Sequence, residues 1–212
     1  MNELVFQRLE NFLNDFHYEK LNGFDLFQQE SKGIKKCVIV NCTPYNDGFM
    51  LELQLGIIIK QIEQYILSFN NQSSEKLTLT YWESLYNVGE LGTKRHFIQN
   101  FVELDKVLHE LENALIKSGF SWLDNYSNLN QISNYLKDII FRSIQKPINF
   151  LKICQRSYLL RLMLKEKLCD SDFYEYYENM QSRRLPDHQL EEFLSFKNYI
   201  DNNYNSISED IN

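Results

Sequence analysis

Residues 49–57 have the sequence FMLELQLGI, in which apolar side chains occupy every second position. This period of two is typical of a β-strand, because successive side chains point to opposite faces of a sheet. Further along the chain, apolar residues recur every three or four positions, as at Leu104, Leu108, Leu111 and Leu115, which is typical of helices. The change of period predicts an α+β fold: a small antiparallel β-meander packed on helices, followed by an all-helical C-terminal half.

The predicted organisation is an α+β domain over residues 1–144, a helical extension packed on it over 145–205, and a disordered tail over 206–212. A chain of 212 residues can bury the core that this arrangement needs without disulfides or metals. The expected strands cover 24–30, 34–43, 49–57, 77–83 and 94–99. The first expected helix carries an apolar stripe over 4–16 and is ended by Leu21-Asn22-Gly23, and the others cover 58–69, 102–118, 130–144, 148–167, 171–183 and 187–204.

Turn-forming residues separate several of these elements. Residues 31–33 (Ser-Lys-Gly) are a hairpin signal, and residues 44–48 indicate a second turn, because proline presets φ and Asp-Gly tolerates positive φ. Residues 86–93 hold two glycines and are expected to form a loop. Gly119 is expected to end the helix that begins near residue 102.

The net charge of −7 disfavours binding to nucleic acid or to an anionic membrane, because both reward positive charge. No secretory signal is visible, and no apolar run approaches the roughly 20 residues that span a bilayer. We therefore expect a cytoplasmic protein, and the high content of Asn, Ile and Lys suggests an AT-rich bacterial genome. Basic residues predominate in 137–167 and acidic residues in 168–212, so these segments are expected to pack together and neutralise each other.

The four cysteines show no spacing that indicates a metal or redox site. Cys37 and Cys154 lie in apolar patterns that favour core positions. Cys42 lies at a strand end, where reactive groups can occur, but packing is its simpler role. Residues 89–92 (Gly-Glu-Leu-Gly) lack the lysine of a P-loop and the third glycine of a dinucleotide fingerprint. No metal or cofactor is expected.

The order of elements resembles the bacterial domain-of-unknown-function family 4304 over about residues 1–141. The segments that carry this resemblance are Phe24-Asp25-Leu26-Phe27, Phe49-Met50-Leu51-Glu52-Leu53, Arg95-His96-Phe97-Ile98, Gly119-Phe120-Ser121-Trp122-Leu123-Asp124 and the helix from Ile132 to Ile140. The resemblance implies a small α+β protein without an assigned activity, and it brings no catalytic residues. Such domains are also similar to immunity proteins of bacterial toxin systems, a likeness of general kind only.

The helix expected at 171–183 carries Phe173, Tyr176 and Met180 on one side and carboxylates on the other. The simpler interpretation is a core-facing stripe opposite a solvated face. The functional alternative is an acidic face that docks on a cationic partner protein such as a toxin, because complementary charge speeds and orients association. The candidate protein-binding residues are Asp172, Glu175, Glu178, Glu191 and Glu192.

The leading hypothesis is a non-enzymatic cytoplasmic binding protein of the immunity type, since the chain is acidic, rich in aromatic residues and free of catalytic motifs. One alternative is an enzyme of unrecognised type, whose site forms around His96 in a cleft between sheet and helices. A further alternative is an oligomeric scaffold with Trp82 and Trp122 at its interface.

Overall fold

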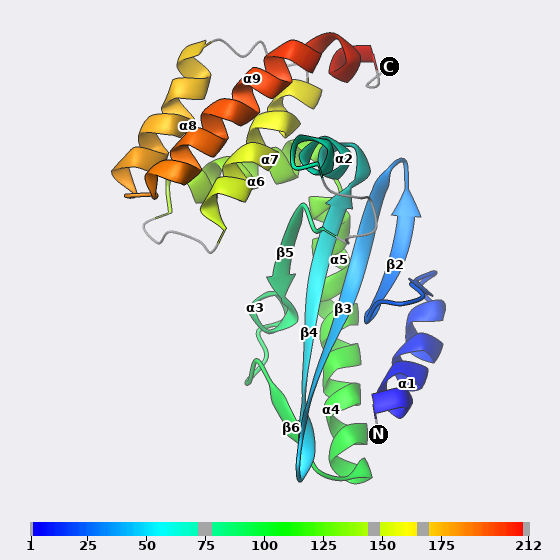
Figure 1. The fold of residues 1–212 in the computed structure, drawn as a ribbon. Helices are drawn as coiled ribbons and strands as arrows, with labels where there is room; N and C mark the ends of the chain where they lie inside the picture. Colours follow the sequence, from blue (N-terminus) through cyan, green and yellow to red (C-terminus); the bar gives the residue numbers. More distant parts are fainter. Residues whose placement is uncertain (1, 72–77, 144–148, 165–169, 210–212) are drawn as a thin grey trace. The chain divides into compact units, whose positions relative to one another are not determined.

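The described chain divides into two compact units. The computed structural model describes residues 2–71, 78–143, 149–164 and 170–209, with side chains within 3–203. The sheet unit comprises Met1–Lys60 and Thr78–Ser127, and the helical unit comprises Gln61–Leu77 and Asn128–Asn212. Figure 1 shows the elements of each unit.

The sheet unit holds one antiparallel sheet of six strands, which confirms the predicted α+β class and its meander. The order is β1-β2-β3-β4-β5, and β6 pairs with β4 at a different level from β5. The strands are β1 (Glu19–Lys20), β2 (Leu26–Ser31), β3 (Ile34–Tyr45), β4 (Gly48–Ile59), β5 (Tyr81–Ser84) and β6 (His96–Ile98).

The β2–β3 hairpin turns where the sequence predicts it. Lys32 and Gly33 have φ values of 50° and 75°, the left-handed pair of a two-residue hairpin loop whose twist matches that of the strands. The predicted turn at 44–48 is too long, because β3 continues to Tyr45 and Pro44 pairs with Phe49. Only Asn46 and Asp47 connect the two strands.

Proline is tolerated within β3 because its nitrogen faces an unpaired edge. The N–H of Val40 donates to the carbonyl of Asp25, so even-numbered residues of β3 direct their backbone groups toward β2. The β2–β3 register ends at Ile39, which leaves the edge of β3 beyond it without a strand partner among the described residues. The missing N–H of Pro44 therefore costs no ladder hydrogen bond, and it discourages further strand pairing there.

Helices cover one face of the sheet (Figure 1). Leu53, Leu55 and Ile57 of β4 are buried on this face, and Tyr81 of β5 packs on Trp122 with ring centroids 5.7 Å apart. The helical segments of the sheet unit are α1 (Asn2–Asn14), α3 (Leu85–Gly89), α4 (Phe101–Ala114), a π-helical turn (Leu115–Gly119) and α5 (Phe120–Tyr126). The short α3 replaces part of the loop predicted at 86–93.

Gly119 does not end a helix, contrary to prediction. The chain stays helical from α4 through the π-helical turn into α5. A Cβ at Gly119 would lie 3.0 Å from Leu115 Cδ2, 3.3 Å from Leu85 Cδ1 and 3.6 Å from Leu55 Cδ1. The glycine thus permits close packing of α3 and β4 on the helix, and glycine content alone does not distinguish this use from a helix stop.

The helical unit is built around α7. Residues on all sides of α7 are buried, and it packs against α6, α8 and α9. The helices of the unit are α2 (Lys60–Phe69, from Gln61 onward), α6 (Leu129–Phe141), α7 (Phe150–Met163), α8 (Asp170–Ser182) and α9 (Asp187–Glu209). Asn128 caps α6 by accepting hydrogen bonds from the backbone of Asn130 and Gln131.

Ion pairs hold the two arginines of α7. Arg156 donates to both carboxylate oxygens of Glu63 on α2, at 2.8 and 2.6 Å, and both side chains are almost fully buried. Arg161 pairs with Asp172 of α8 at 2.9 Å, so the basic and acidic segments do neutralise each other at this point. The predicted neutralisation is partial, because the partner of Arg156 precedes both segments.

Aromatic side chains fill the space between α7, α8 and α9. Phe173 stacks on Phe193 with centroids 4.8 Å apart, and the hydroxyls of Tyr176 and Ser157 share a buried hydrogen bond of 2.9 Å. The predicted apolar stripe of α8 is confirmed as core, since Phe173, Tyr176 and Met180 are buried.

Some predicted boundaries cannot be compared with the structure. The boundary between residues 144 and 145 lies outside the described residues. The helix predicted at 187–204 is longer, because α9 ends at Glu209, and the predicted tail at 206–212 overlaps it and continues beyond the described residues. Within the described ranges, no helix combines the length and the apolar character that a bilayer-crossing segment requires.

Candidate functional site

The candidate site lies on the sheet face that the helices of the sheet unit leave open (Figure 1). Asn41 pairs with Glu52 and Thr43 with Met50, so these four side chains share that face. Their neighbours along β4, such as Leu51 and Leu53, point to the helical face and are buried. Polar groups therefore gather at the centre of the open face.

Glu52 is a buried carboxylate at a change of strand partner. The pairing of β4 with β6 ends at Leu51 and its pairing with β5 begins at Gln54, so Glu52 lies in the interval. Its side chain is only 4% exposed, although the alternation correctly directs it away from the apolar core. Burial of a charge requires partners, and residues flanking both partner strands supply them.

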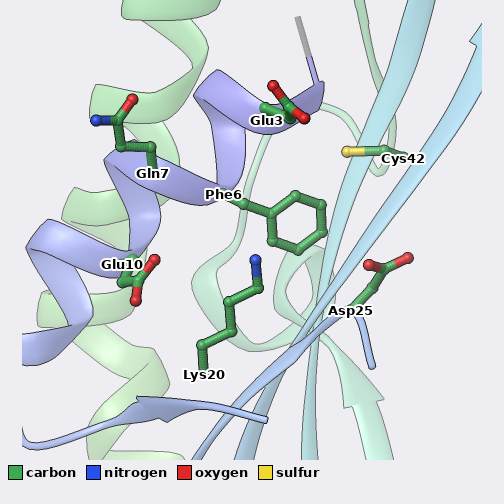
Figure 2. Close-up of a pocket in the computed structure, with 7 residues that line it drawn as sticks. All are labelled: Glu3, Phe6, Gln7, Glu10, Lys20, Asp25 and Cys42. Carbon is green, nitrogen blue, oxygen red and sulfur yellow. The ribbon is translucent and has the colours of Figure 1, made fainter. Parts of the chain in front are cut away.

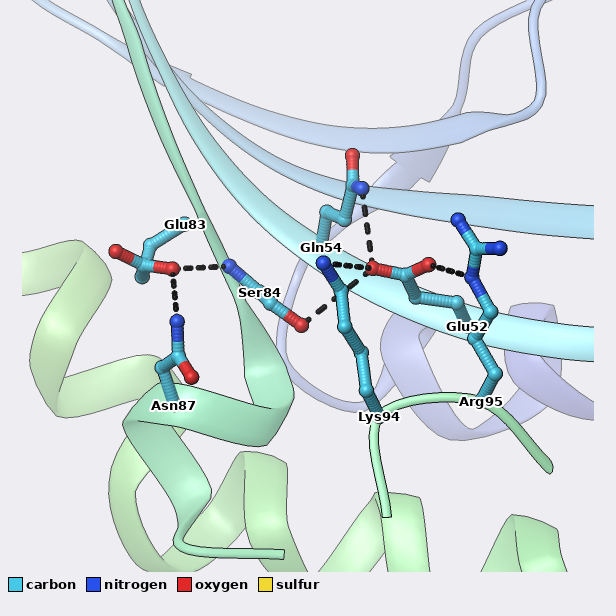
Figure 3. Close-up of polar contacts among 7 residues, drawn as sticks. All are labelled: Glu52, Gln54, Glu83, Ser84, Asn87, Lys94 and Arg95. Carbon is cyan, nitrogen blue, oxygen red and sulfur yellow. Dashed lines mark hydrogen bonds and ion pairs between the residues drawn. The ribbon is translucent and has the colours of Figure 1, made fainter. Parts of the chain in front are cut away.

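Four groups contact the Glu52 carboxylate (Figure 3). Oε2 accepts a hydrogen bond of 3.0 Å from Arg95 Nε, and Oε1 lies 3.7 Å from Lys94 Nζ. Oε1 also accepts from Gln54 Nε2 at 3.2 Å and from the Ser84 hydroxyl at 3.5 Å. The carboxylate thus connects the end of β5 to the segment that enters β6.

A second carboxylate supports this arrangement from the start of α3. Glu83 accepts hydrogen bonds from the backbone N–H of Ser84 at 2.8 Å and from Asn87 Nδ2 at 2.7 Å. Figure 3 shows both contacts beside the Glu52 cluster. They fix the point where β5 passes into α3, and so help to hold the Ser84 hydroxyl near Glu52.

Arg95 is anchored through only part of its guanidinium. Nε bonds Glu52, but the side chain remains 63% exposed and its two terminal nitrogens have no partner among the described residues. A pocket of about 230 Å³ opens beside it. The lining residues are Asn41, Thr43, Met50, Glu52, Gln54 and Arg95. This pocket offers cationic and neutral hydrogen-bonding groups on an otherwise regular sheet.

Aromatic side chains lie on the same face. Tyr45 and Phe97 are 54% and 41% exposed, and their rings meet edge to face at 6.0 Å. Phe97 is the cross-strand partner of Met50, which lines the pocket. Trp82 pairs with Gly56 further along β4 and is 47% exposed. Aromatic groups therefore lie on both sides of the polar centre along the sheet.

His96 does not belong to this site. It pairs with Leu51, which directs its imidazole to the helical face, where it is 7% exposed. Nε2 is buried without a hydrogen-bond partner in the described part of the chain, and His96 does not line the pocket beside Arg95. Burial lowers the pKa of His96 below 6.5, an effect that the nearby Glu110 carboxylate opposes. The described surroundings give the catalytic alternative no support.

A second groove of the sheet unit, of about 350 Å³, lies between α1 and the strands (Figure 2). Its lining residues are Glu3, Phe6, Gln7, Glu10, Lys20, Asp25 and Cys42. Lys20 is held over the Phe6 ring, with Nζ 4.8 Å from the centroid. Burial, assisted by the Asp25 carboxylate, raises the pKa of Cys42 to about 11, so the thiol is protonated at neutral pH. The groove therefore lacks an activated nucleophile.

The structure separates the five candidate residues of the predicted acidic face. Asp172 is paired with Arg161, and Glu192 accepts a hydrogen bond of 3.4 Å from Gln155. Glu175 lines a cavity of about 330 Å³ in the helical unit whose other lining residues include Lys137, Arg142 and Arg161. Three of the candidates thus face basic or amide groups of their own chain.

Glu175, Glu178 and Glu191 are the candidates with exposed side chains, on α8 and α9. None of the three has a hydrogen bond or ion pair among the described residues. A docking role for the acidic face remains a prediction, and it depends mainly on these three carboxylates.

The residues of the pocket were only partly foreseeable from sequence. Arg95 immediately precedes the candidate His96, and Glu52 interrupts an apolar strand, which is a signal for a buried, paired charge. Their juxtaposition depends on β6 pairing with β4, across 43 residues. In the described ranges, no three residues among His, Cys, Asp and Glu come together as metal ligands would.

Comparison with known proteins adds no assignment: no family model, no curated protein and no solved structure matches this chain. The resemblance to family 4304 therefore stays a prediction.

Proposed function

We propose that this chain is a non-enzymatic binding protein that docks a partner protein on the open face of its sheet. The main support is a group of three aromatic side chains, each about half exposed, around a cationic pocket: Tyr45, Phe97 and Trp82. Large aromatic side chains are the groups that most often dominate the energy of protein interfaces. Their placement on the face that the helices of the sheet unit leave open supports a docking role.

The chemistry of the pocket supports binding rather than bond-making. Its one carboxylate, Glu52, already interacts with Lys94 and Arg95, so it is a poor general base. Among the described residues that line this pocket, Thr43 supplies the only hydroxyl, and none supplies an imidazole or a thiol. Donors that remain exposed next to apolar rings suit recognition of a mixed polar and apolar surface.

The partner that we propose is a protein segment bearing an acidic group together with apolar side chains. Lys94 and Arg95 are both at least half exposed, so they can meet an acidic group. The edge-to-face pair of Tyr45 and Phe97 can cover apolar side chains that flank it. The net charge of −7 slows the approach of such a partner, so affinity must come from contacts at short range.

Selection of peptides from a random displayed library tests this proposal. We expect selected peptides to lose at least roughly tenfold in affinity for Tyr45→Ala/Phe97→Ala, since each aromatic anchor typically supplies more than 1 kcal/mol. Tyr174→Ala is the matched control, because Tyr174 is equally exposed, at 54%, in the helical unit. Equal binding to wild type and to the Tyr45→Ala/Phe97→Ala variant would reject the open face as the docking site.

A second candidate is the immunity-type hypothesis, in which a cationic toxin binds the acidic face. The exposed carboxylates of Glu178 and Glu191 favour it. Charge reversal by Glu178→Lys and Glu191→Lys should then weaken binding to a cationic protein such as a nuclease, more strongly at low salt. Unchanged affinity at low ionic strength would reject this face.

A further inference from the structure

We infer that the pocket beside Arg95 is a binding site for a single carboxylate group and that Glu52 positions Arg95 to bind it. This inference rests on the proposed function, because it names the group that the docked partner would place at the polar centre of the open face.

The guanidinium has a free edge for a second carboxylate. Glu52 engages Nε of Arg95, which leaves the edge formed by the two terminal nitrogens without a partner in the described chain. That edge can donate two parallel hydrogen bonds to the two oxygens of a carboxylate. Figure 3 shows Nε as the guanidinium nitrogen joined to Glu52, with no dashed line to either terminal nitrogen.

The local charge fits a monoanion. Lys94 and Arg95 carry two positive charges, and Glu52 carries one negative charge within 4 Å of both. One positive charge remains, which a carboxylate balances and a phosphate dianion exceeds. The remaining lining groups that can bond, the Asn41 amide and the Thr43 hydroxyl, are neutral.

The size of the pocket fits a group carried by a larger partner. Its volume of about 230 Å³ is below the roughly 300–1,000 Å³ of pockets that enclose whole small-molecule ligands. An acidic side chain would occupy part of it, with room for neighbouring atoms of the partner, while the rest of the partner lies across Met50 and the neighbouring Phe97 ring. The proposed occupant is therefore an Asp or Glu side chain of the partner protein.

Glu52 acts as a positioning residue. Long arginine side chains lose considerable rotamer entropy when they are ordered by a ligand. The bond to a carboxylate that is 4% exposed orders Arg95 before binding, and the further contacts from Gln54 and Ser84 hold that carboxylate in place. Loss of the Glu52 charge should therefore leave Arg95 less ordered before binding, although it also removes a negative charge that repels the incoming carboxylate.

Two small probes of nearly equal size, one with a carboxylate and one with a neutral amide, test the inference. N-acetyl-aspartate methylamide and N-acetyl-asparagine methylamide are titrated into the full-length protein, and the NMR signals of the Arg95 side chain are followed. We expect saturable shifts with the aspartate probe and at least roughly tenfold weaker binding of the asparagine probe, because charge-assisted bonds are about twice as strong as neutral ones.

Three variants locate the effect. Arg95→Lys keeps the charge but loses the two-pronged edge, and it should weaken the aspartate probe by roughly tenfold, as followed on the Met50 methyl group and neighbouring amides. Glu52→Gln should release the Arg95 side chain in the free protein, which the NMR signals of Arg95 report before any probe is added, separately from the change in local charge. Arg8→Lys is the matched control on the sheet unit, since Arg8 forms an exposed pair with Asp105, and it should bind as wild type does.

The outcomes separate this inference from the proposed function. The carboxylate-binding site would be overturned by any of three results: equal affinity for both probes, unchanged affinity of Arg95→Lys for the aspartate probe, or no NMR shift at the highest soluble probe concentration. Tighter binding of inorganic phosphate than of the aspartate probe would also overturn it. If the selected peptides require Tyr45 and Phe97 but bind the Arg95→Lys variant as tightly as wild type, the docking function stands and the carboxylate-binding site is rejected. If the aspartate probe binds as expected but the selected peptides bind equally well without Tyr45 and Phe97, the carboxylate site stands and the docking function is rejected.

Discussion

Replacement of Glu63 by glutamine should destabilise the helical unit strongly. The side chains of Glu63 and Arg156 are 5% and 7% exposed, and two hydrogen bonds of 2.8 and 2.6 Å join them. Removing one partner of such a pair leaves the other charge buried, which costs about 3–5 kcal/mol. This loss is a large part of the roughly 5–15 kcal/mol that stabilises an ordinary domain.

The pair should nevertheless be replaceable as a whole. Exchange of both partners for apolar side chains, as in Glu63→Leu/Arg156→Met, removes both desolvation penalties and should bring stability back to within about 1–2 kcal/mol of wild type. The matched control is Asp138→Asn, which breaks the exposed pair of Asp138 and Arg142 and should cost no more than about 1 kcal/mol.

Urea unfolding followed by two probes measures these changes. Both tryptophans, Trp82 and Trp122, belong to the sheet unit, so fluorescence follows that unit, whereas circular dichroism at 222 nm also follows the helical unit. For an m-value of about 2 kcal/mol/M, Glu63→Gln should lower the dichroism midpoint by roughly 2 M. A shift under about 0.5 M, or a double variant as unstable as the single one, would refute the reasoning.

Three further expectations concern the sheet unit. Because folding lowers the pKa of His96, the unfolded chain binds more protons at low pH, and the free energy of unfolding should fall as pH drops below 6.5. The fall should be at most about 1.4 kcal/mol per pH unit. Urea titrations at pH 5 to 7 should show a smaller fall for His96→Leu. Cys42, whose pKa is about 11, should react with iodoacetamide far more slowly at pH 8 than a free thiol, and peptide mapping that finds rapid labelling would contradict its burial. Gly48→Ala should cost about 1–3 kcal/mol by thermal unfolding, since its Cβ would overlap the carbonyl oxygen of Ile98 and displace β6 from β4; an unchanged melting temperature would count against this packing.

Local patterns predicted most of the elements, because the spacing of apolar residues within a segment differs between strands and helices. The alternation at 49–57 identified β4, and Lys32-Gly33 fixed the first hairpin. The failures came from residues whose role depends on distant partners. Pro44 fits within β3 because no described strand pairs with the edge of β3 that its nitrogen faces. Gly119 permits close packing of its helix on α3 and β4.

The candidate site shows the same limit. Sequence alternation places Glu52 on the face away from the core, as observed. The predicted candidate His96 does not line the pocket, whereas the preceding Arg95 does. The sequence did not indicate that Arg95, rather than His96, would meet Glu52, because this requires β6 to pair with β4 beyond the end of β5. Such non-local pairing has no local signature.

The insertion of α2 between β4 and β5 limits how this chain can be divided. The segment Gln61–Leu77 belongs to the helical unit, although strands of the sheet unit precede and follow it. A gene fragment that starts at Asn128 would encode α6 to α9 without the carboxylate that neutralises Arg156. The helices thus differ from a module that recombination can append to a finished domain, because part of their interior is encoded upstream, between two strands of the sheet.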